Sequence, residues 1–471
     1  MQKKENILFY TTIVYNMPDS KEKVEVESLL DKNKVLYSRP PSTNIVINST
    51  HHVDYANCGK YNNATPAIFD SSISGNSFVS GRESYLRFDV SVKSASADKL
   101  LILPPGGACG LIQTVVISSR NVELSRTENF NILSGYRIQW EHNEAEVNSC
   151  DAEGVISQNN MIDSDTPNGI EFCKKPVPVL KTSLTGETNY KTFCIPMRRL
   201  SALFDSDQLL PPQLLSSLRM VLSWTPVATA FSLASGEDDA NFPTSFTINN
   251  PRITWKTYTL ADQYARKISE ITARQGLYLP IFEYFNSSSQ YTSSQVNFRI
   301  EKSCSRAVEL IVVENDTTLL TAPIQKGVQP LASKVFSTKN FQAHLGPIYY
   351  PVQRLETTGN VPATIDNITE FFQYSKYALG NKTSLSKNAF FDGVAVVGGS
   401  DTESGLKYRA PMGLMAVDLR LNNQTATAGV QINSAVSLLV DYSSDPDKTV
   451  NRWLKYVRLI NIFSNNIKVE E

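Results

Sequence analysis

The sequence predicts an all-β protein with two tandem eight-stranded jelly rolls (a double jelly roll), short helices in the loops and a helical connector between the halves. Short segments alternate apolar and polar residues, a period of two that is typical of strands with one buried face. Matching segments recur in the same order in both halves. Charged residues make up only 19% while Asn, Ser and Thr are plentiful, which suits β domains with long polar loops.

The chain is long enough for more than one domain. Its 471 residues exceed the usual size of a single core, and each half has room for two sheets of short strands packed face to face. We predict an N-terminal arm at 1–70, a first jelly roll at 71–260, a helical connector at 261–276 and a second jelly roll at 277–471. The arm holds weak patterns and many turn formers, so we expect it to become ordered only against a neighbour.

Alternation marks the strands. The clearest strand, at 85–92, places four apolar side chains on one face: Leu86, Phe88, Val90 and Val92. The same pattern returns at 296–300, and the alternating segment 218–224 has a counterpart at 436–442. Each half then ends in an aromatic-bearing strand, at 252–258 and at 453–463.

Two helical segments interrupt this pattern. Between two strands, Leu209, Leu210, Leu214 and Leu215 predict a compact helical turn, and Pro211-Pro212 fits its first turn, where a missing amide hydrogen costs nothing. After residue 260 the apolar spacing changes to four, four and three, which indicates a short amphipathic helix ended by Gly276. The polar stretches 141–178 and 357–387 are expected to be long loops.

Glycine-rich and acidic segments are the candidates for ligand sites in this sequence. Residues 104–110 (PPGGACG) lead into a strand rather than a helix with a Lys-Ser/Thr pair, so a turn is favoured over a phosphate loop, and 397–401 fails on the same grounds. Residues 163–169 imitate the start of a calcium loop, but the glycine is out of register and Lys174 stands where a bidentate Glu is needed. The trio Glu237, Asp238 and Asp239 is interpreted as a solvated loop.

The spacing of the histidines and cysteines predicts neither a metal site nor a disulfide framework. The four histidines, His51, His52, His142 and His344, lack metal-ligand spacing, and His344 is expected to pack or to form hydrogen bonds. The six cysteines are spread without a CxxC pair and are expected to be reduced thiols: Cys58, Cys109, Cys150, Cys173, Cys194 and Cys304. Neither a signal peptide nor a membrane span is predicted. We therefore assign no catalytic, cofactor-binding or metal-binding residues.

Four segments resemble the double jelly-roll major capsid proteins of double-stranded DNA viruses. Residues 111–135 (LIQTVVISSRNVELSRTENFNILSG) are similar to the strand pair and turn after the first strand of that family, and 193–224 (FCIPMRRLSALFDSDQLLPPQLLSSLRMVLSW) to its strand, leucine-rich helix and strand. Residues 246–255 (FTINNPRITW) resemble the strand that closes the first jelly roll, and 453–469 (WLKYVRLINIFSNNIKV) the C-terminal strand. The length of the chain and its compact loops are most similar to those of the major capsid proteins of polinton-like viruses and virophages.

The resemblance implies a major capsid protein and not an enzyme. It implies a homotrimer that forms a pseudo-hexameric capsomer in an icosahedral virion shell, assembled inside the host cell. The implied partners are further copies, neighbouring capsomers, and penton and minor capsid proteins. Lys plus Arg (45) nearly balance Asp plus Glu (46), so no sequence-specific nucleic-acid contact is expected.

Two other classes stay open from the residues alone. A secreted carbohydrate-binding protein with two β-sandwiches would show a signal peptide, disulfides or a calcium loop. A β-sandwich glycoside hydrolase would need a pair of carboxylates facing each other across a cleft.

Overall fold

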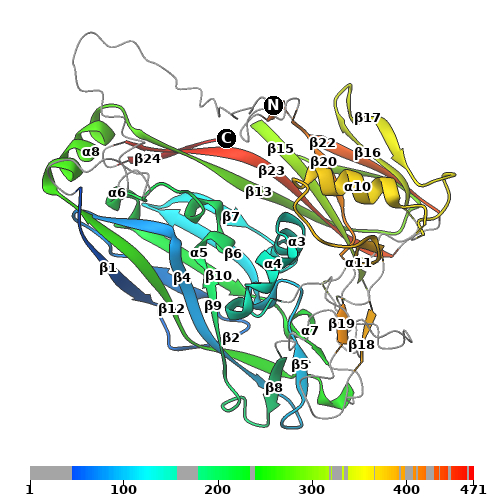
Figure 1. The fold of residues 1–471 in the computed structure, drawn as a ribbon, viewed down its shortest axis with the longest axis horizontal. Helices are drawn as coiled ribbons and strands as arrows, with labels where there is room; N and C mark the ends of the chain where they lie inside the picture. The colour runs from blue at the N-terminus through cyan, green and yellow to red at the C-terminus, as the bar shows by residue number, and fades with distance from the viewer. Residues whose placement is uncertain are drawn as a thin grey trace, which may run out of the picture.

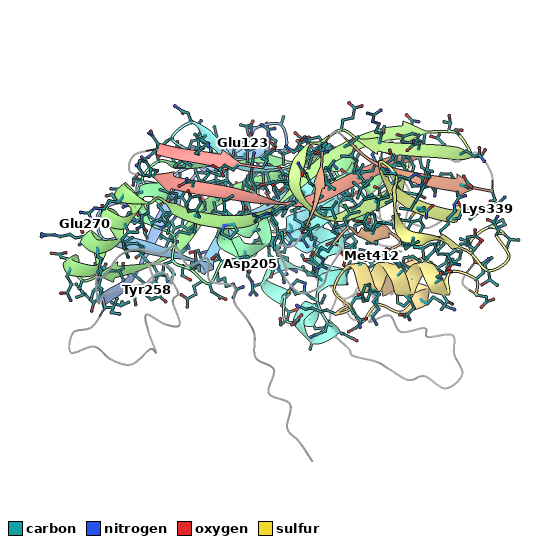
Figure 2. All side chains as sticks on the ribbon, turned by 90° about the horizontal axis from the view of Figure 1, so that it is seen from above. Glu123, Asp205, Tyr258, Glu270, Lys339 and Met412 are labelled. Atoms are coloured by element: carbon teal, nitrogen blue, oxygen red, sulfur yellow. The ribbon has the colours of Figure 1, made fainter. Side chains whose placement is uncertain are left out.

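The computed structural model contains two β-sandwiches joined side by side (Figure 1). It describes residues 45–155, 179–233, 239–317, 320, 331, 333, 338–364, 366–391, 394–397, 407–409, 412–420, 429–433, 435–443, 447–463 and 466–471. Seen from above, Glu270 and Lys339 mark opposite ends of the long axis, and Asp205 lies between them (Figure 2).

Two sheets form the first half. The larger contains β1 (Val46–Tyr55), β2 (Lys60–Asn62), β4 (Ser77–Lys93), β5 (Leu100–Ile102), β8 (Val179–Ser183), β9 (Lys191–Pro196), β11 (Ser232–Leu233) and β12 (Ser245–Leu260). The smaller has the order β3 (Ala67–Asp70), β10 (Leu218–Trp224), β6 (Ile112–Ser119) and β7 (Val122–Thr127). The first half therefore has more strands than the eight predicted for each jelly roll, because several short strands extend the larger sheet.

The second half repeats this plan. One sheet contains β13 (Leu277–Tyr291), β15 (Cys304–Asp316), β20 (Met415–Asp418), β21 (Val430–Ile432), β23 (Lys448–Phe463) and β24 (Asn466–Glu470). The other has the order β14 (Gln295–Ile300), β22 (Val436–Tyr442), β16 (Thr338–Leu345) and β17 (Ile348–Glu356). A separate pair joins β18 (Val394–Val397) to β19 (Lys407–Arg409).

Short helices fill the loops and edges. They are η1 (Gly107–Leu111), α3 (Phe130–Glu141), α4 (Glu144–Asn148), η2 (Asp151–Glu153), α5 (Met197–Leu200), η3 (Ala202–Phe204), α6 (Pro212–Leu215), α7 (Val227–Ala230), η4 (Asp239–Asn241), α8 (Asp262–Arg274), α10 (Thr369–Ala378) and α11 (Lys387–Phe391). The predicted turn at the proline pair is α6, with Pro212 in its first turn and the four leucines buried. The predicted helix before Gly276 is α8.

The strands predicted from alternation are confirmed. In β4, Leu86, Phe88, Val90 and Val92 are fully buried, and β10 buries every second residue from Leu218 to Trp224. Their counterparts β14 and β22 show the same period, because each lines the space between two packed sheets.

The prediction of an N-terminal arm is wrong for residues 46–70. These residues form β1, β2 and β3, and β1 pairs antiparallel with β12 from Val46 opposite Leu260 to Tyr55 opposite Arg252. Most of β1 is exposed, so its sequence shows no apolar alternation, and the period that identifies strands was absent. The remainder of the predicted arm, 1–44, lies outside the described residues.

Helices occupy both segments predicted to be loops. The stretch 141–178 starts with α4 and η2, and α10 lies within 357–387. Within 111–135, β6 and β7 form the expected strand pair around a turn at Arg120 and Asn121, and α3 begins after it at Phe130. Helix α3 is buried on nearly every side, so no polar stripe revealed it.

The cores of the two halves share elements. Within α3, Phe130 and Ile138 belong to the core of the first half, whereas Tyr136 and Trp140 belong to the core of the second. The paired strands β13 and β23 also span both cores: Leu277, Leu279, Ile460 and Ile462 pack in the first, while Tyr284, Trp453 and Leu454 pack in the second. The halves therefore do not have independent interiors.

Candidate functional site: the junction between the halves

The glycine-rich segment at 104–110 is a buried turn. Gly107 has φ +59°, and a Cβ there would lie 2.4 Å from the carbonyl oxygen of Glu153. The segment packs against η2 and continues into β6, so it presents no open cradle for a phosphate. The loop at 163–169, residues 398–401, Glu237 and Asp238 lie outside the described residues.

The histidines lie apart in the fold. His51 and His52 are on β1, where His52 Nε2 is 2.8 Å from Asp54 Oδ1. His344 packs edge-on against Tyr349 with ring centroids 4.4 Å apart, as expected of a packing residue. Nowhere in the described part of the chain do three or more His, Cys, Asp or Glu side chains gather as a metal site.

His142 lies where the two halves meet. Its Nε2 is 2.9 Å from Arg199 Nη1, so the ring accepts a hydrogen bond from the guanidinium. Burial, with the nearby charge of Arg199, lowers the pKa of His142. Arg199 also donates to Cys150 Sγ at 3.1 Å and pairs with Glu153 at 3.3 Å, which holds η2 against α5.

The described cysteines are unpaired. Cys58, Cys109, Cys150, Cys194 and Cys304 are free thiols, and Cys173 lies outside the described residues. Burial raises the pKa of Cys304 to about 11, which keeps that thiol protonated and unreactive at neutral pH.

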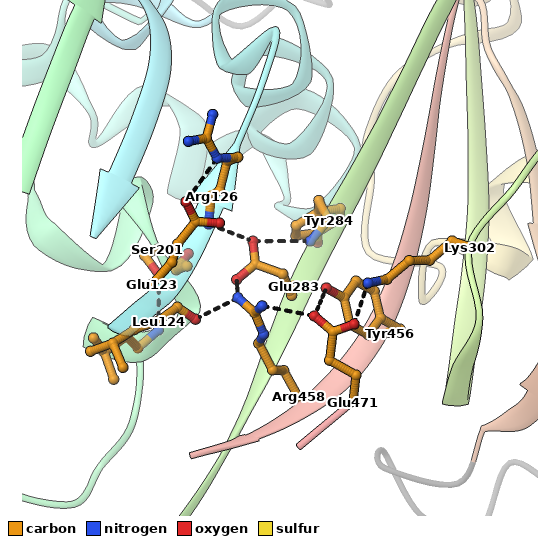
Figure 3. A network of polar contacts seen from close by, with 12 residues as sticks. Glu123, Leu124, Arg126, Ser201, Glu283, Tyr284, Lys302, Tyr456, Arg458 and Glu471 are labelled. Atoms are coloured by element: carbon orange, nitrogen blue, oxygen red, sulfur yellow. Dashed lines mark hydrogen bonds and ion pairs between the residues drawn. The ribbon is translucent and has the colours of Figure 1, made fainter. Parts of the chain in front are cut away.

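Charged side chains gather on the strands that span both cores. Arg458 of β23 donates from Nη1 to the Leu124 carbonyl oxygen of β7 at 2.9 Å and from Nη2 to Glu471 Oε1 at 2.7 Å (Figure 3). Glu471 also accepts from Lys302. Glu283 of β13 lies 3.9 Å from Arg458 and accepts from the Arg126 main-chain N–H at 3.3 Å. The network therefore ties β7 of the first half to β13 and β23.

Burial dominates the electrostatics of Glu283. Burial raises the pKa of its carboxyl to about 7, against the opposing attraction of Arg458. One buried acid between a cation and main-chain donors is a structural arrangement. A glycoside hydrolase would need a second carboxylate across a cleft, and Glu471 instead faces the same guanidinium.

A second buried cluster lies on the other side of the same strands. Lys455 of β23 is 3.2 Å from Glu309 and 3.8 Å from Glu141, and Glu141 is 3.2 Å from Arg137. Burial opposes the charge of Lys455, but Glu309, Tyr284 and Glu141 together outweigh burial, so the pKa of Lys455 is raised. Two cations and two carboxylates thus alternate between α3, β15 and β23.

Directional hydrogen bonds supplement these ion pairs. The indole N–H of Trp453 donates to the Glu128 carbonyl at 3.1 Å, and that of Trp140 donates to the Met412 carbonyl at 3.0 Å. Asn129 donates to Asn286 Oδ1 at 2.9 Å. Since each bond joins residues of different halves, the arrangement fixes one orientation of the two sandwiches.

Sequence reasoning did not find this junction. The charged residues of the junction lie far apart in the sequence. They stand on strands that were identified from their apolar residues, and those residues face the other side of the strand. A usable signal exists: Glu283 and Glu309 are buried charged residues inside otherwise apolar strands, which is uncommon unless such groups are paired.

Comparisons with solved structures identify the architecture. A chain of the Sputnik virophage, solved by cryo-EM, aligns with TM-score 0.56 and 12% identity over 98% of this chain and 94% of that chain. The Faustovirus major capsid protein gives TM-score 0.56 and 7% identity over 91% and 94%. A chain of the PBCV-1 capsid gives TM-score 0.54 and 10% identity over 92% and 99%.

These likenesses confirm the predicted fold. The chain has the double jelly-roll fold of major capsid proteins, and the likeness covers both halves in order. No protein-family model and no curated protein sequence matches it. Among the described residues, no helix is long and apolar enough to cross a membrane.

Proposed function

We propose that the protein is a major capsid protein that builds the icosahedral virion shell of a double-stranded DNA virus. The observation that carries this proposal is the likeness to capsid chains over nearly the full length of both partners, with both jelly rolls included. Assembly would take place inside the host cell, with penton and minor capsid proteins as further partners. A place among virophages or polinton-like viruses stays a prediction, since the Sputnik and Faustovirus chains align equally well.

In this proposal three copies close into a pseudo-hexameric capsomer. Two sandwiches held side by side in each chain give six in a three-fold ring, and cyclic closure buries complementary sides of neighbouring subunits. The junction supports the proposal because it fixes the spacing of the two sandwiches before any copy meets another. Fixed geometry lowers the ordering cost of association.

The oligomeric state tests the proposal. Native mass spectrometry and analytical ultracentrifugation of the purified full chain should show a trimer, and negative-stain images should show flat rings with six lobes or closed shells. A chain that stays monomeric at high concentration and in added salt would contradict the capsid assignment. Three disulfides in a thiol titration would instead favour the secreted carbohydrate-binding alternative.

A further inference from the structure

A cavity of about 350 Å³ opens at the junction, between α3 and α5 of the first half and β13, β15, β23 and the end of α10 of the second. This volume lies within the range of small-molecule sites. Asp205, one of its lining residues, lies between the ends of the molecule in Figure 2. Six cationic side chains line it: Arg137, Arg198, Arg199, Lys382, Arg420 and Lys455. Three carboxylates do so: Glu141, Asp205 and Glu309.

Four of the cations are neutralised within the protein. Arg137 and Lys455 alternate with Glu141 and Glu309 in the cluster described above. Arg199 pairs with Glu153, and Arg420 pairs with Asp418 at 2.7 Å. These inner groups are largely buried, so their charges are fixed in position and poorly screened.

Two cations stay uncompensated. Arg198 of α5 and Lys382, just after α10, are exposed, and no acceptor among the described residues pairs with either. Asp205, the remaining carboxylate of the lining, is 3.2 Å from Arg82 and shares that guanidinium with Asp207, so these two acids leave one negative charge against the two free cations. The cavity thus carries an unbalanced positive charge contributed by both halves.

The C-terminal end of α10 does not repel an anion bound in the cavity, because its last carbonyl oxygens accept main-chain hydrogen bonds. A helix C-terminus normally presents free carbonyl oxygens, which repel negative charge. Here the main-chain N–H groups of Leu379, Gly380 and Asn381 donate to the carbonyls of Ser375, Tyr377 and Lys376 at 3.1, 3.1 and 2.8 Å. Gly380 adopts φ +86° to close this cap, and Lys382 follows it at the cavity.

We propose that this cavity binds a small multivalent oxyanion of the phosphate class, held by Arg198 from the first half and Lys382 from the second. A singly charged or compact anion would satisfy one cation, whereas a chain of phosphate groups can contact both. Binding stabilises the folded chain by mass action and adds a bridge across the junction. The site does not depend on the capsid assignment, since it is built within one chain.

Inorganic tripolyphosphate is the probe. Isothermal titration calorimetry of the full chain at neutral pH and low salt should show one site per chain, with a rise in melting temperature on binding. The double variant Arg198→Gln/Lys382→Gln should lose at least about tenfold in affinity, and each single variant should lie between it and the parent. Orthophosphate should bind at least about tenfold more weakly than tripolyphosphate.

A charge-matched control separates the site from general attraction. Arg219→Gln/Lys468→Gln removes the same net charge from exposed positions on β10 and β24, outside the cavity lining, and should leave affinity unchanged. Equal affinity of the cavity double variant and the parent would overturn the proposal. Binding of a short single-stranded oligonucleotide without binding of tripolyphosphate would also overturn it, because it would indicate a nucleic-acid surface.

Discussion

Leu214 shows what one apolar side chain contributes to the first half. It lies on the single-turn helix α6, fully buried beside Leu209, Leu210 and Leu215. Leu210 also bonds through its main chain to Val79 of β4, so the leucines and the sheet are held in one place. A charge introduced here would have neither water nor a partner.

We predict that Leu214→Asp lowers the free energy of unfolding by about 4 kcal/mol or more. Urea denaturation of the parent and the variant would measure this. Ser216→Asp is the control, because Ser216 ends the same helix with an exposed side chain, and the change there should cost less than about 1 kcal/mol. Equal stability of Leu214→Asp and the parent would mean that the leucines are not buried as described.

Glu283 gives the junction a dependence on pH. With a pKa raised to about 7, the folded chain holds a proton on Glu283 that the unfolded chain releases near pH 4.3. The contribution of this group to stability is therefore full below about pH 4 and is lost as pH rises to about 7. The loss over this range amounts to ~3 kcal/mol.

Comparison with Glu283→Gln isolates that contribution. The glutamine has no carboxyl proton to lose, so the stability of the parent relative to the variant should fall between pH 5 and pH 7. Urea midpoints at several pH values provide the measurement. Glu301→Gln serves as the control, since that carboxylate is exposed beside Arg299. A difference between parent and Glu283→Gln that stays constant over this range would refute the assignment.

At the scale of elements, β1 belongs to the sandwich although its sequence looks like a tail. Asp54 is its one buried residue, and its Oδ2 accepts from the indole N–H of Trp255 on β12 at 2.6 Å. Thr50 Oγ1 is 2.8 Å from Thr257 Oγ1 in the same ladder. Polar contacts, rather than an apolar face, hold the strand in place.

We predict that Asp54→Ala destabilises the chain by about 1–3 kcal/mol, because the Trp255 indole is buried and would lose its acceptor. Thermal unfolding, together with hydrogen exchange of β1 amides, would report both the cost and its location. Ser49→Ala on the exposed face of the same strand should change neither. Unchanged exchange in Asp54→Ala would mean that backbone pairing alone holds β1.

Elements differed in how readily the sequence revealed them. Strands β4, β10, β14 and β22 were predictable because one face is apolar and the period of two is intact. Helix α10 carried an overlooked signal, since Phe371, Ser375 and Ala378 follow helical spacing and are buried. Helix α4 likewise has a capping box, in which Asn143 and Glu146 bond each other's main chain.

The junction could not be predicted from the sequence in the same way. Glu283 and Arg458 lie 175 positions apart, and their proximity depends on the pairing of β13 with β23. Position in a strand predicts which face a side chain takes, but not which distant charge it meets. Long-range ion pairs therefore became visible only in the folded chain.

For the whole molecule, sharing of elements predicts cooperative unfolding. Because β13, β23 and α3 contribute to both cores, neither half keeps a complete interior when the other unfolds. We expect one calorimetric transition whose van't Hoff and calorimetric enthalpies agree. Leu214→Asp in the first half and Phe298→Ala in the second should each lower the temperature of that same transition. Two resolved transitions would show that the halves unfold independently.

Strands β13 and β23 form one continuous rigid ladder that runs through both sandwiches (Figure 1). Their pairing extends from Leu277 opposite Ile462 to Tyr291 opposite Lys448. Because this ladder is uninterrupted, the two sandwiches cannot hinge about the junction. Curvature in any assembly of this chain must therefore be taken up between chains, at contacts that can tilt. The distance between the two sandwich axes is a fixed length within a single polypeptide, and the variety of shapes available to an assembly depends on how the copies meet.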